Sequence, residues 1–443
     1  MSSKILVHYI LFFVLMFQKV LLAQNEGGLK GGSLFSSAIG NNSISLNPAN
    51  FWTSRKSNFS ILLPLSFQLN NNSVSPDWLN SYLLSGKILD DQSVDNMLGE
   101  IPESGLSLSG HGHLMLFGLS YKWLAMYIGG SADAYGTIPK SIFNTVFQGI
   151  EFDRTIDLSD TRFGMQAVLP ISLVLSGKFG NNLYMGLGVK GLLGLAYLSI
   201  NSSGGIISHE DKLSGNGSVD IQYNMGDLYI ERDSLLAYSA VGKFSPSING
   251  KGYAIDLGVT KLIGNKWTLG FSIQNIMGTI NWDANTSHSQ VIQFDMDLNS
   301  GEFEEINEYT ESQQDSLMET IITEEVTTTI DNLTSTFPLR IEVESDYVFG
   351  TQFLMFNSIS YEDKTTIIPE SQLEFSGGFR WLIHRRIPVT FGITYNSLWG
   401  IKWGGGLGAH FNNYHLDILF SQNGGFINEA KGFSLNLINY FYF

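Results

Sequence analysis

The sequence predicts an all-β protein, a closed antiparallel transmembrane β-barrel of about 14 strands (14 to 16). Three observations predict this fold. The N-terminus carries a short apolar segment typical of export, long stretches of the chain alternate between apolar and polar residues, and the last strand ends on an aromatic residue. Beyond residue 23 no stretch approaches the roughly 18 apolar residues that a membrane helix needs, which excludes a helical membrane protein.

Composition narrows the class of function. The 443 residues include 41 acidic and 25 basic side chains, a formal net charge of -16. This balance disfavours nucleic-acid binding, because phosphates are neutralised by a basic surface. With 13% aromatic residues and only 15% charged residues, the chain does not have the composition of a disordered protein. The absence of cysteine excludes disulfides, thiolate metal sites, cysteine nucleophiles and a lipoprotein anchor.

Residues 1–23 have the features of a secretory signal peptide. Lys4 precedes an apolar run from Ile5 to Phe17, and the small residue Ala23 stands at the expected cleavage point. The run is shorter than the roughly 20 residues of a spanning helix. An uncleaved N-terminal membrane anchor is the alternative. We therefore predict export, with a mature chain that begins at Gln24.

Long segments of the mature chain have the period of two that is typical of a strand with one apolar face. The pattern occupies 57–69 and recurs at 162–176, 183–197, 372–383 and 401–411. Many such segments run for about 11 to 19 residues, whereas strands of soluble proteins usually stop near 6. A soluble sandwich with shorter strands is the alternative. Small residues on the inward face suit a curved wall: Gly186, Gly188, Gly404, Gly406 and Gly408.

Aromatic residues mark the strand ends and the C-terminus. The final segment places Phe433, Leu435, Leu437, Phe441 and Phe443 on one face. It resembles the C-terminal signal that the outer-membrane barrel-assembly machinery reads, and we assign that signal to Phe441 and Phe443. Aromatic residues near other strand ends indicate interfacial girdles, with packing in a core as the alternative: Tyr121, Trp123, Trp267, Trp282, Trp381, Trp399 and Trp403.

The connections divide into short and long ones. With Phe443 in the periplasm, the short links near 347–350, 384–386 and 412–413 are periplasmic and the longer links are extracellular. The stretch 267–339 holds 13 acids and no Lys or Arg, so we predict an acidic extracellular loop over about 283–336. A calcium site is the alternative, but no calcium-loop spacing is present. Helical spacing in 76–102 and 140–147 predicts helices at the mouth of the barrel.

Two motifs resemble a known family. The segment that ends in Asn47-Pro48-Ala49 resembles the glycine- and alanine-rich N-terminal segment of long-chain fatty acid transporters of the FadL type and their PorV-like relatives. An Asp256-Leu-Gly strand followed by Gly270-x-Ser-x-x-Asn275 resembles a strand pair of the same group. The resemblance implies that residues 24–50 form a plug in the lumen and residues 51–443 form the barrel. Pro48, with its fixed φ, suits a sharp entry from plug to wall; an ordinary turn is the alternative.

The same resemblance implies a function. It implies an outer-membrane protein that binds or passes small hydrophobic ligands such as fatty acids. The alternative is a PorV-like accessory or interaction protein, whose partner is a secreted protein. Other expected partners are outer-membrane lipid and the assembly machinery, and we expect no nucleic acid and no cofactor.

Enzyme and metal sites are not expected. His111 and His113 point the same way on one strand, but two ligands are too few for a metal site, so we predict that they face the lumen. No trio of serine, histidine and a polar orienting residue can be selected from the sequence. We therefore expect no catalytic and no metal-binding residues.

The predicted fold can be tested by gel electrophoresis. Intact membrane barrels resist dodecyl sulfate until they are boiled, because the closed ring of strands opens only as a unit. The purified protein should therefore migrate faster before boiling than after it. Identical migration of the boiled and unboiled samples would contradict a membrane barrel.

Overall fold

The computed structural model describes residues 47–50, 59–84, 86, 89–121, 123–149, 153–209, 212–226, 229–234, 237–241, 247–299, 320–350, 352–383, 386–411 and 413–443. Residues 1–23 and most of the expected plug, 24–46, lie outside this part of the chain, so the signal peptide and the plug stay predictions.

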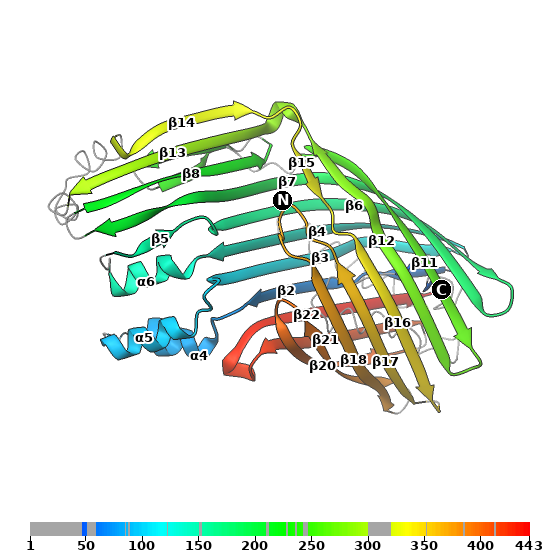
Figure 1. The fold of residues 1–443 in the computed structure, drawn as a ribbon. Helices are drawn as coiled ribbons and strands as arrows, with labels where there is room; N and C mark the ends of the chain where they lie inside the picture. Colours follow the sequence, from blue (N-terminus) through cyan, green and yellow to red (C-terminus); the bar gives the residue numbers. More distant parts are fainter. Residues whose placement is uncertain are drawn as a thin grey trace, which may run out of the picture.

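Fourteen strand positions close into an antiparallel barrel, which confirms the predicted fold class and strand number (Figure 1). The first position is shared by β1 (Phe59–Leu62) and β2 (Leu65–Asn71), because Pro64 between them has no N–H to donate. Both strands pair with the last strand, and this contact closes the ring. The other wall strands are β3 (Leu106–Tyr121), β4 (Leu124–Ile138), β6 (Arg162–Phe179), β7 (Leu183–His209), β11 (Gly250–Ile263), β12 (Trp267–Trp282), β16 (Arg340–Phe349), β17 (Phe353–Glu362), β18 (Gln372–Ile383), β19 (Ile387–Asn396), β20 (Gly400–His410), β21 (Tyr414–Gly424) and β22 (Ala430–Tyr442).

The wall is apolar outside and polar inside. In β2 the side chains of Leu65, Phe67 and Leu69 are 41–43% exposed, whereas Ser66 and Gln68 are at most 5% exposed. The other wall strands alternate in the same sense, with exposed leucine, isoleucine and phenylalanine against buried serine, threonine and asparagine. A soluble sandwich would bury the apolar face instead. An exposed apolar outer face of this kind is the face that transmembrane barrels present to lipid.

The two ends of the barrel differ. At one end, turns of two or three residues follow β3, β6, β11, β16, β18 and β20. The long connections all lie at the other end. Because transmembrane barrels have short periplasmic turns and longer extracellular loops, the end with the long connections is the extracellular one, as expected from the sequence.

A sheet projects from the extracellular end. β7 has 27 residues, and beyond its pairing with β6 and β11 it continues alongside β8 (Lys212–Asn224) (Figure 1). β13 (Ser287–Asn299) pairs with β8, and β14 (Ile322–Thr329) pairs with β13. The region expected as an acidic loop therefore contains these two strands and β15 (Thr334–Thr336), which pairs with β12. A separate hairpin joins β9 (Tyr229–Ser234) and β10 (Ala237–Val241).

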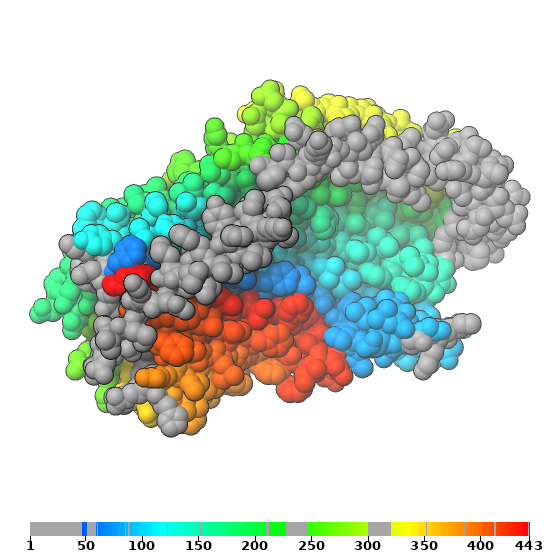
Figure 2. Space-filling model, turned by 180° about the vertical axis from the view of Figure 1, so that it is seen from behind, coloured from blue at the N-terminus to red at the C-terminus, as the bar shows by residue number. Residues whose placement is uncertain are grey.

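The expected helices are confirmed at the extracellular end. They are α4 (Pro76–Trp78) with the π-helix η2 (Leu79–Leu83), α5 (Asp91–Gly99) and α6 (Lys140–Gln148), and the short strand β5 (Thr155–Asp157) follows α6. Trp78, Met97, Leu98 and Ile101 form their common core. Of these helices, α4 lies beside the 3-10 turn η5 (Ile427–Glu429) of the β21–β22 connection (Figure 2). In the described part of the chain, every helix is too short or too polar to cross a bilayer.

The lipid-facing surface can be tested at Val189. This side chain is 51% exposed in the part of β7 that pairs with β6 and β11. V189R should lower the free energy of unfolding by about 2–4 kcal/mol, because it places a cation in the hydrocarbon layer. Urea unfolding in phospholipid vesicles measures the change, with V189I as the matched apolar control. A V189R barrel as stable as V189I would show that this face does not contact lipid.

Candidate functional site in the barrel lumen

The predicted plug motif lies inside the barrel. Asn47, Pro48 and Ala49 are all buried. The Asn47 side chain donates to Glu344 Oε1 (3.0 Å) and to Thr260 Oγ1 (3.4 Å). Asn50 donates to the same Glu344 oxygen (2.9 Å). The motif is thereby attached to the inner face of β11 and β16.

Further hydrogen bonds fix the backbone of the motif. The Ala49 N–H donates to Asn47 Oδ1 (3.0 Å), which bends the chain into a local turn. Ser176 Oγ of β6 donates to the Ala49 carbonyl oxygen (3.2 Å), and Thr260 Oγ1 donates to Asn50 Oδ1 (2.7 Å). The turn expected as an alternative is present, and it is held by three different wall strands.

Three wall glycines make room for these contacts. A β-carbon on Gly186 would overlap Pro48, one on Gly258 would overlap Asn47, and one on Gly270 would overlap Glu344. These glycines lie on the neighbouring strands β7, β11 and β12. Because glycine has no β-carbon, these three positions form a recess in the inner wall. This role is separate from the curvature of the wall that glycines were expected to permit.

The second motif forms a buried ion pair next to the recess. Lys190 Nζ of β7 lies 2.8 Å from Asp256 Oδ2 and donates to Asn275 Oδ1 (2.6 Å). Asp256 Oδ1 accepts the backbone N–H of Asn275 (2.8 Å). Asn275 adopts a positive φ of 59°, and the β11–β12 register shifts around it. The contact with Asp256 therefore stabilises a bulge in β12.

Other charged side chains also pair inside the wall. Arg380 Nη2 lies 2.8 Å from Asp417, and His410 Nε2 lies 3.2 Å from the same carboxylate. His111 Nδ1 lies 2.9 Å from Asp133 Oδ1, so it faces the lumen as expected. Among the described residues no group of three histidine or carboxylate side chains could hold a metal ion.

An apolar cluster occupies the extracellular half of the lumen. Its members come from the inner faces of β4, β6, β7, β11 and β12 and from three connections, and they include Leu192, Tyr197, Ile280, Trp282, Ile367 and Trp399. Trp282 packs on Tyr197 with ring centroids 5.6 Å apart and donates to Ser335 Oγ (3.0 Å). For Trp282 and Trp399 the girdle assignment is wrong, because both point inward; Trp123, Trp267 and Trp381 are exposed on the outside.

The connection between β17 and β18 is tied down where it enters this cluster. Asp363 Oδ1 accepts hydrogen bonds from Ser371 Oγ (3.0 Å), Tyr361 Oη (3.1 Å) and the Lys364 N–H (2.9 Å). The Ser371 hydrogen bond, with the others, holds the pKa of Asp363 below its usual value. The stability that these hydrogen bonds give to the folded loop is therefore present at neutral pH, where Asp363 is ionised. It is lost as the pH falls through the lowered pKa of Asp363. The loop carries Ile367 and Ile368 into the apolar cluster.

A second apolar cluster lies near the short-turn end. It includes Met115, Tyr127, Phe356, Leu419 and Ile438. This second cluster draws mainly on β3, β4, β17, β21 and β22, whereas residues 47–50 contact β6, β11 and β16.

The predicted assembly signal lies at the closing seam. Phe441 pairs with Ile61 of β1 and packs on Tyr414, with centroids 4.7 Å apart. The Phe443 N–H donates to the Phe59 carbonyl oxygen (3.0 Å), and its side chain is 47% exposed. Their recognition by the assembly machinery stays a prediction.

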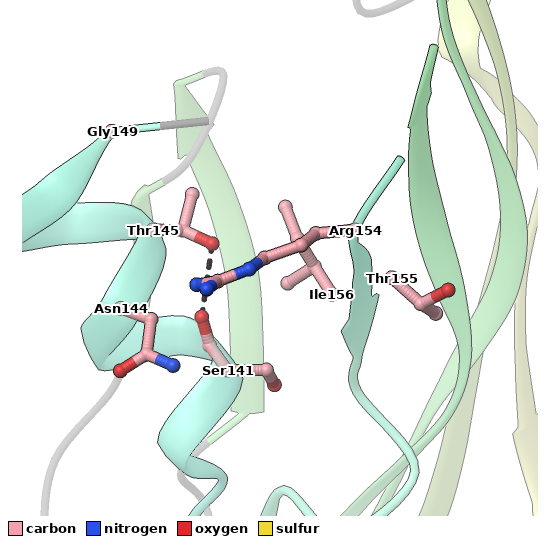
Figure 3. Close-up of a pocket in the computed structure, with 7 residues that line it drawn as sticks. All are labelled: Ser141, Asn144, Thr145, Gly149, Arg154, Thr155 and Ile156. Carbon is pink, nitrogen blue, oxygen red and sulfur yellow. Dashed lines mark hydrogen bonds between the residues drawn. The ribbon is translucent and has the colours of Figure 1, made fainter. Parts of the chain in front are cut away.

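A polar cleft of about 150 Å³ lies outside the barrel, between α6 and β5 (Figure 3). Arg154 points toward α6, where Thr145 Oγ1 donates to the Ser141 carbonyl oxygen (2.9 Å). The cleft lining has neither a carboxylate nor a histidine, so it offers no pair for acid–base chemistry.

Sequence reasoning missed Glu344, Thr260 and Lys190 as partners of the motifs. One signal was available for Glu344: Glu342, Glu344 and Asp346 alternate with apolar or neutral residues, which places three carboxylates on the inward face of one strand. The partner of Glu344, Asn47, is 297 residues away in the chain and could not be inferred from spacing.

The recess can be tested with Gly258. G258A should displace residues 47–50 from the wall while the barrel stays closed, because the added β-carbon would occupy the place of Asn47. Since the chain has no cysteine, an A49C substitution supplies a unique probe. Maleimide should label A49C slowly and A49C/G258A at least about tenfold faster. G130A is the control, since its β-carbon would meet nothing within 4 Å. Equal labelling of all three proteins would show that the recess does not hold the motif.

Comparisons with known proteins agree with the architecture. No curated protein matches the sequence. The toluene transporter TodX of P. putida has a TM-score of 0.51 at 10% identity, covering 95% of this chain and 99% of TodX. The toluene transporter TbuX of Ralstonia pickettii has a TM-score of 0.49 at 12% identity, covering 94% and 99%. A FadL homologue of Pseudomonas aeruginosa has a TM-score of 0.47 at 11% identity, covering 95% and 98%.

The likeness to TodX is one of fold, and at that level the expected resemblance to FadL-type proteins is confirmed. A sequence family described as "Family of unknown function (DUF5723)" matches residues 48–419, which is most of the chain and begins within the Asn47-Pro48-Ala49 motif. The chain belongs to this DUF5723 family.

Proposed function

We propose that the protein is an outer-membrane barrel that binds small apolar molecules and passes them across that membrane. The observation that carries the proposal is the apolar cluster around Leu192, Trp282 and Ile367 inside the extracellular half of the lumen. The lumen of a barrel is usually polar, so a large apolar cluster there needs a reason. An apolar site with a few polar groups, such as Ser335, is what a small hydrophobic ligand requires.

The structural neighbour supports the same class of ligand. TodX is a toluene transporter, and its barrel covers nearly the whole of this chain. The proposal assigns no catalytic step to the protein. The alternative role as an accessory of protein secretion rests on the sequence resemblance alone.

We also propose that residues 24–50 restrict the passage. The supporting observation is the attachment of residues 47–50 to Ser176, Thr260 and Glu344 across the inner wall. A segment fixed there occupies part of the lumen cross-section. A ligand could then cross the lumen only beside residues 24–50, or after these residues had moved away from the wall.

The apolar cluster can be tested by binding measurements. Leu192 is fully buried in the cluster, and L192N should weaken the binding of an uncharged fluorescent probe, N-phenyl-1-naphthylamine, by about tenfold or more, because an amide would enter an apolar site. Titration of the detergent-purified barrel, followed by probe fluorescence, measures the affinity.

L419N is the matched control. Leu419 is 1% exposed and points inward in the other cluster, so its substitution should leave probe binding within about twofold. Unchanged migration of the unboiled band would show that both variants are folded. Equal binding by L192N and the unchanged protein would exclude the cluster as the ligand site, and a copurifying secreted protein in place of bound ligand would favour the accessory role.

A further inference from the structure

The inner face of the barrel carries more acid than base. Among the described residues of the fourteen wall strands, eight inward-pointing carboxylates and four inward-pointing cations are buried or nearly so. Glu342, Glu344 and Asp346 form a row on β16, and five other strands contribute Asp133, Asp256, Glu362, Glu374 and Asp417. The cations are Lys190, Arg340, Arg380 and Lys402.

Most of these cations are already engaged by carboxylates of the wall. Lys190 lies 2.8 Å from Asp256, Arg380 lies 2.8 Å from Asp417, and Arg340 lies 3.5 and 3.8 Å from Glu342 and Glu362. A ligand carboxylate could reach these groups only in competition with the carboxylates of the protein. These three cations therefore offer an anion no site that the protein's own carboxylates do not already share.

The N-terminal segment does not reverse this balance. Residues 24–58 contain three cationic side chains, Lys30, Arg55 and Lys56, and one acidic side chain, Glu26. With the α-amino group of a mature chain that begins at Gln24, the net charge of +3 would offset three of the four excess carboxylates on the wall. The acidic character of the lumen does not depend on where this segment lies.

We propose that the lumen selects uncharged apolar molecules and discriminates against apolar carboxylates, including fatty-acid anions. The proposal rests on the proposed function and names the class of ligand. A carboxylate that entered the lumen would leave water and approach an excess of like charge, and both effects oppose its binding. An uncharged molecule of the same size meets only the apolar cluster and the paired groups around it.

The test compares an uncharged and an anionic ligand of the same chain length. Decanol and decanoate have the same chain, and decanoate is ionised at pH 7.5. Each is titrated against N-phenyl-1-naphthylamine bound to the full-length barrel in detergent. Decanol should displace the probe at a concentration at least about tenfold lower than decanoate, after correction for the partition of each ligand into detergent.

Two variants of β18 move the charge in opposite directions. Glu374 and Gln372 both point inward and are 2% and 4% exposed. E374Q should lower the ratio of the decanoate concentration to the decanol concentration that displaces the probe, and Q372E should raise this ratio. In both variants the affinity for decanol should stay within about twofold of that of the unchanged protein. The unboiled gel band shows that each variant is folded, and effects of opposite sign separate charge from a general loss of structure.

The outcomes distinguish the two proposals. Equal affinity for decanol and decanoate would overturn charge selection and leave the apolar site intact. The same conclusion would follow if the ratio of decanoate to decanol displacement concentrations were equal in E374Q and Q372E. Binding of neither ligand, with no binding of the probe, would instead overturn the proposed function. A tighter binding of decanoate than of decanol would identify a fatty-acid carrier and contradict the inference.

Discussion

Closure of the strand ring is the constraint on which the rest of the molecule depends. In the hydrocarbon layer each backbone N–H and C=O needs a partner within the protein, so no strand edge can remain open there. Pairing of β22 with β1 and β2 meets this need, and the turns of two or three residues keep neighbouring strands in register. Once the ring is closed, the period of two assigns every second side chain to lipid and the others to a confined interior.

That interior is specialised along its length and around its wall. Glycines on β7 and β11 leave the space that residues 47–50 fill, a glycine on β12 leaves space for Glu344, and Asp256 on the same wall holds the bulge at Asn275. The apolar cluster lies toward the extracellular end, where the connection with Ile367 and Ile368 folds inward. The two sequence motifs that resembled the FadL-type proteins thus meet on one patch of inner wall, although more than 200 residues separate them along the chain.

The sequence predicted the features that depend on local periodicity. Alternation identified the wall strands, and helical spacing identified α5 and α6. Features that depend on contacts distant in the chain could not be predicted. Trp282 and Trp399 have the same local pattern as Trp267 and Trp381, and only the inward fold of the connections makes them part of a core. In the acidic region, β13 and β14 form because β8 extends beyond the barrel and offers an edge, which no property of that region reveals.

The attachment of residues 47–50 has a consequence for the order of biogenesis. These residues directly precede the first wall strand, yet their partners Ser176, Thr260 and Glu344 belong to β6, β11 and β16. If the polypeptide enters the bilayer strand by strand from the N-terminal end, residues 47–50 must wait for all three partners until the eighth wall position, β16, is in place; from the C-terminal end the last partner arrives with the eleventh position, β6. Their docking is then a late step of maturation, and a nascent barrel would remain unsealed until the wall is more than half built.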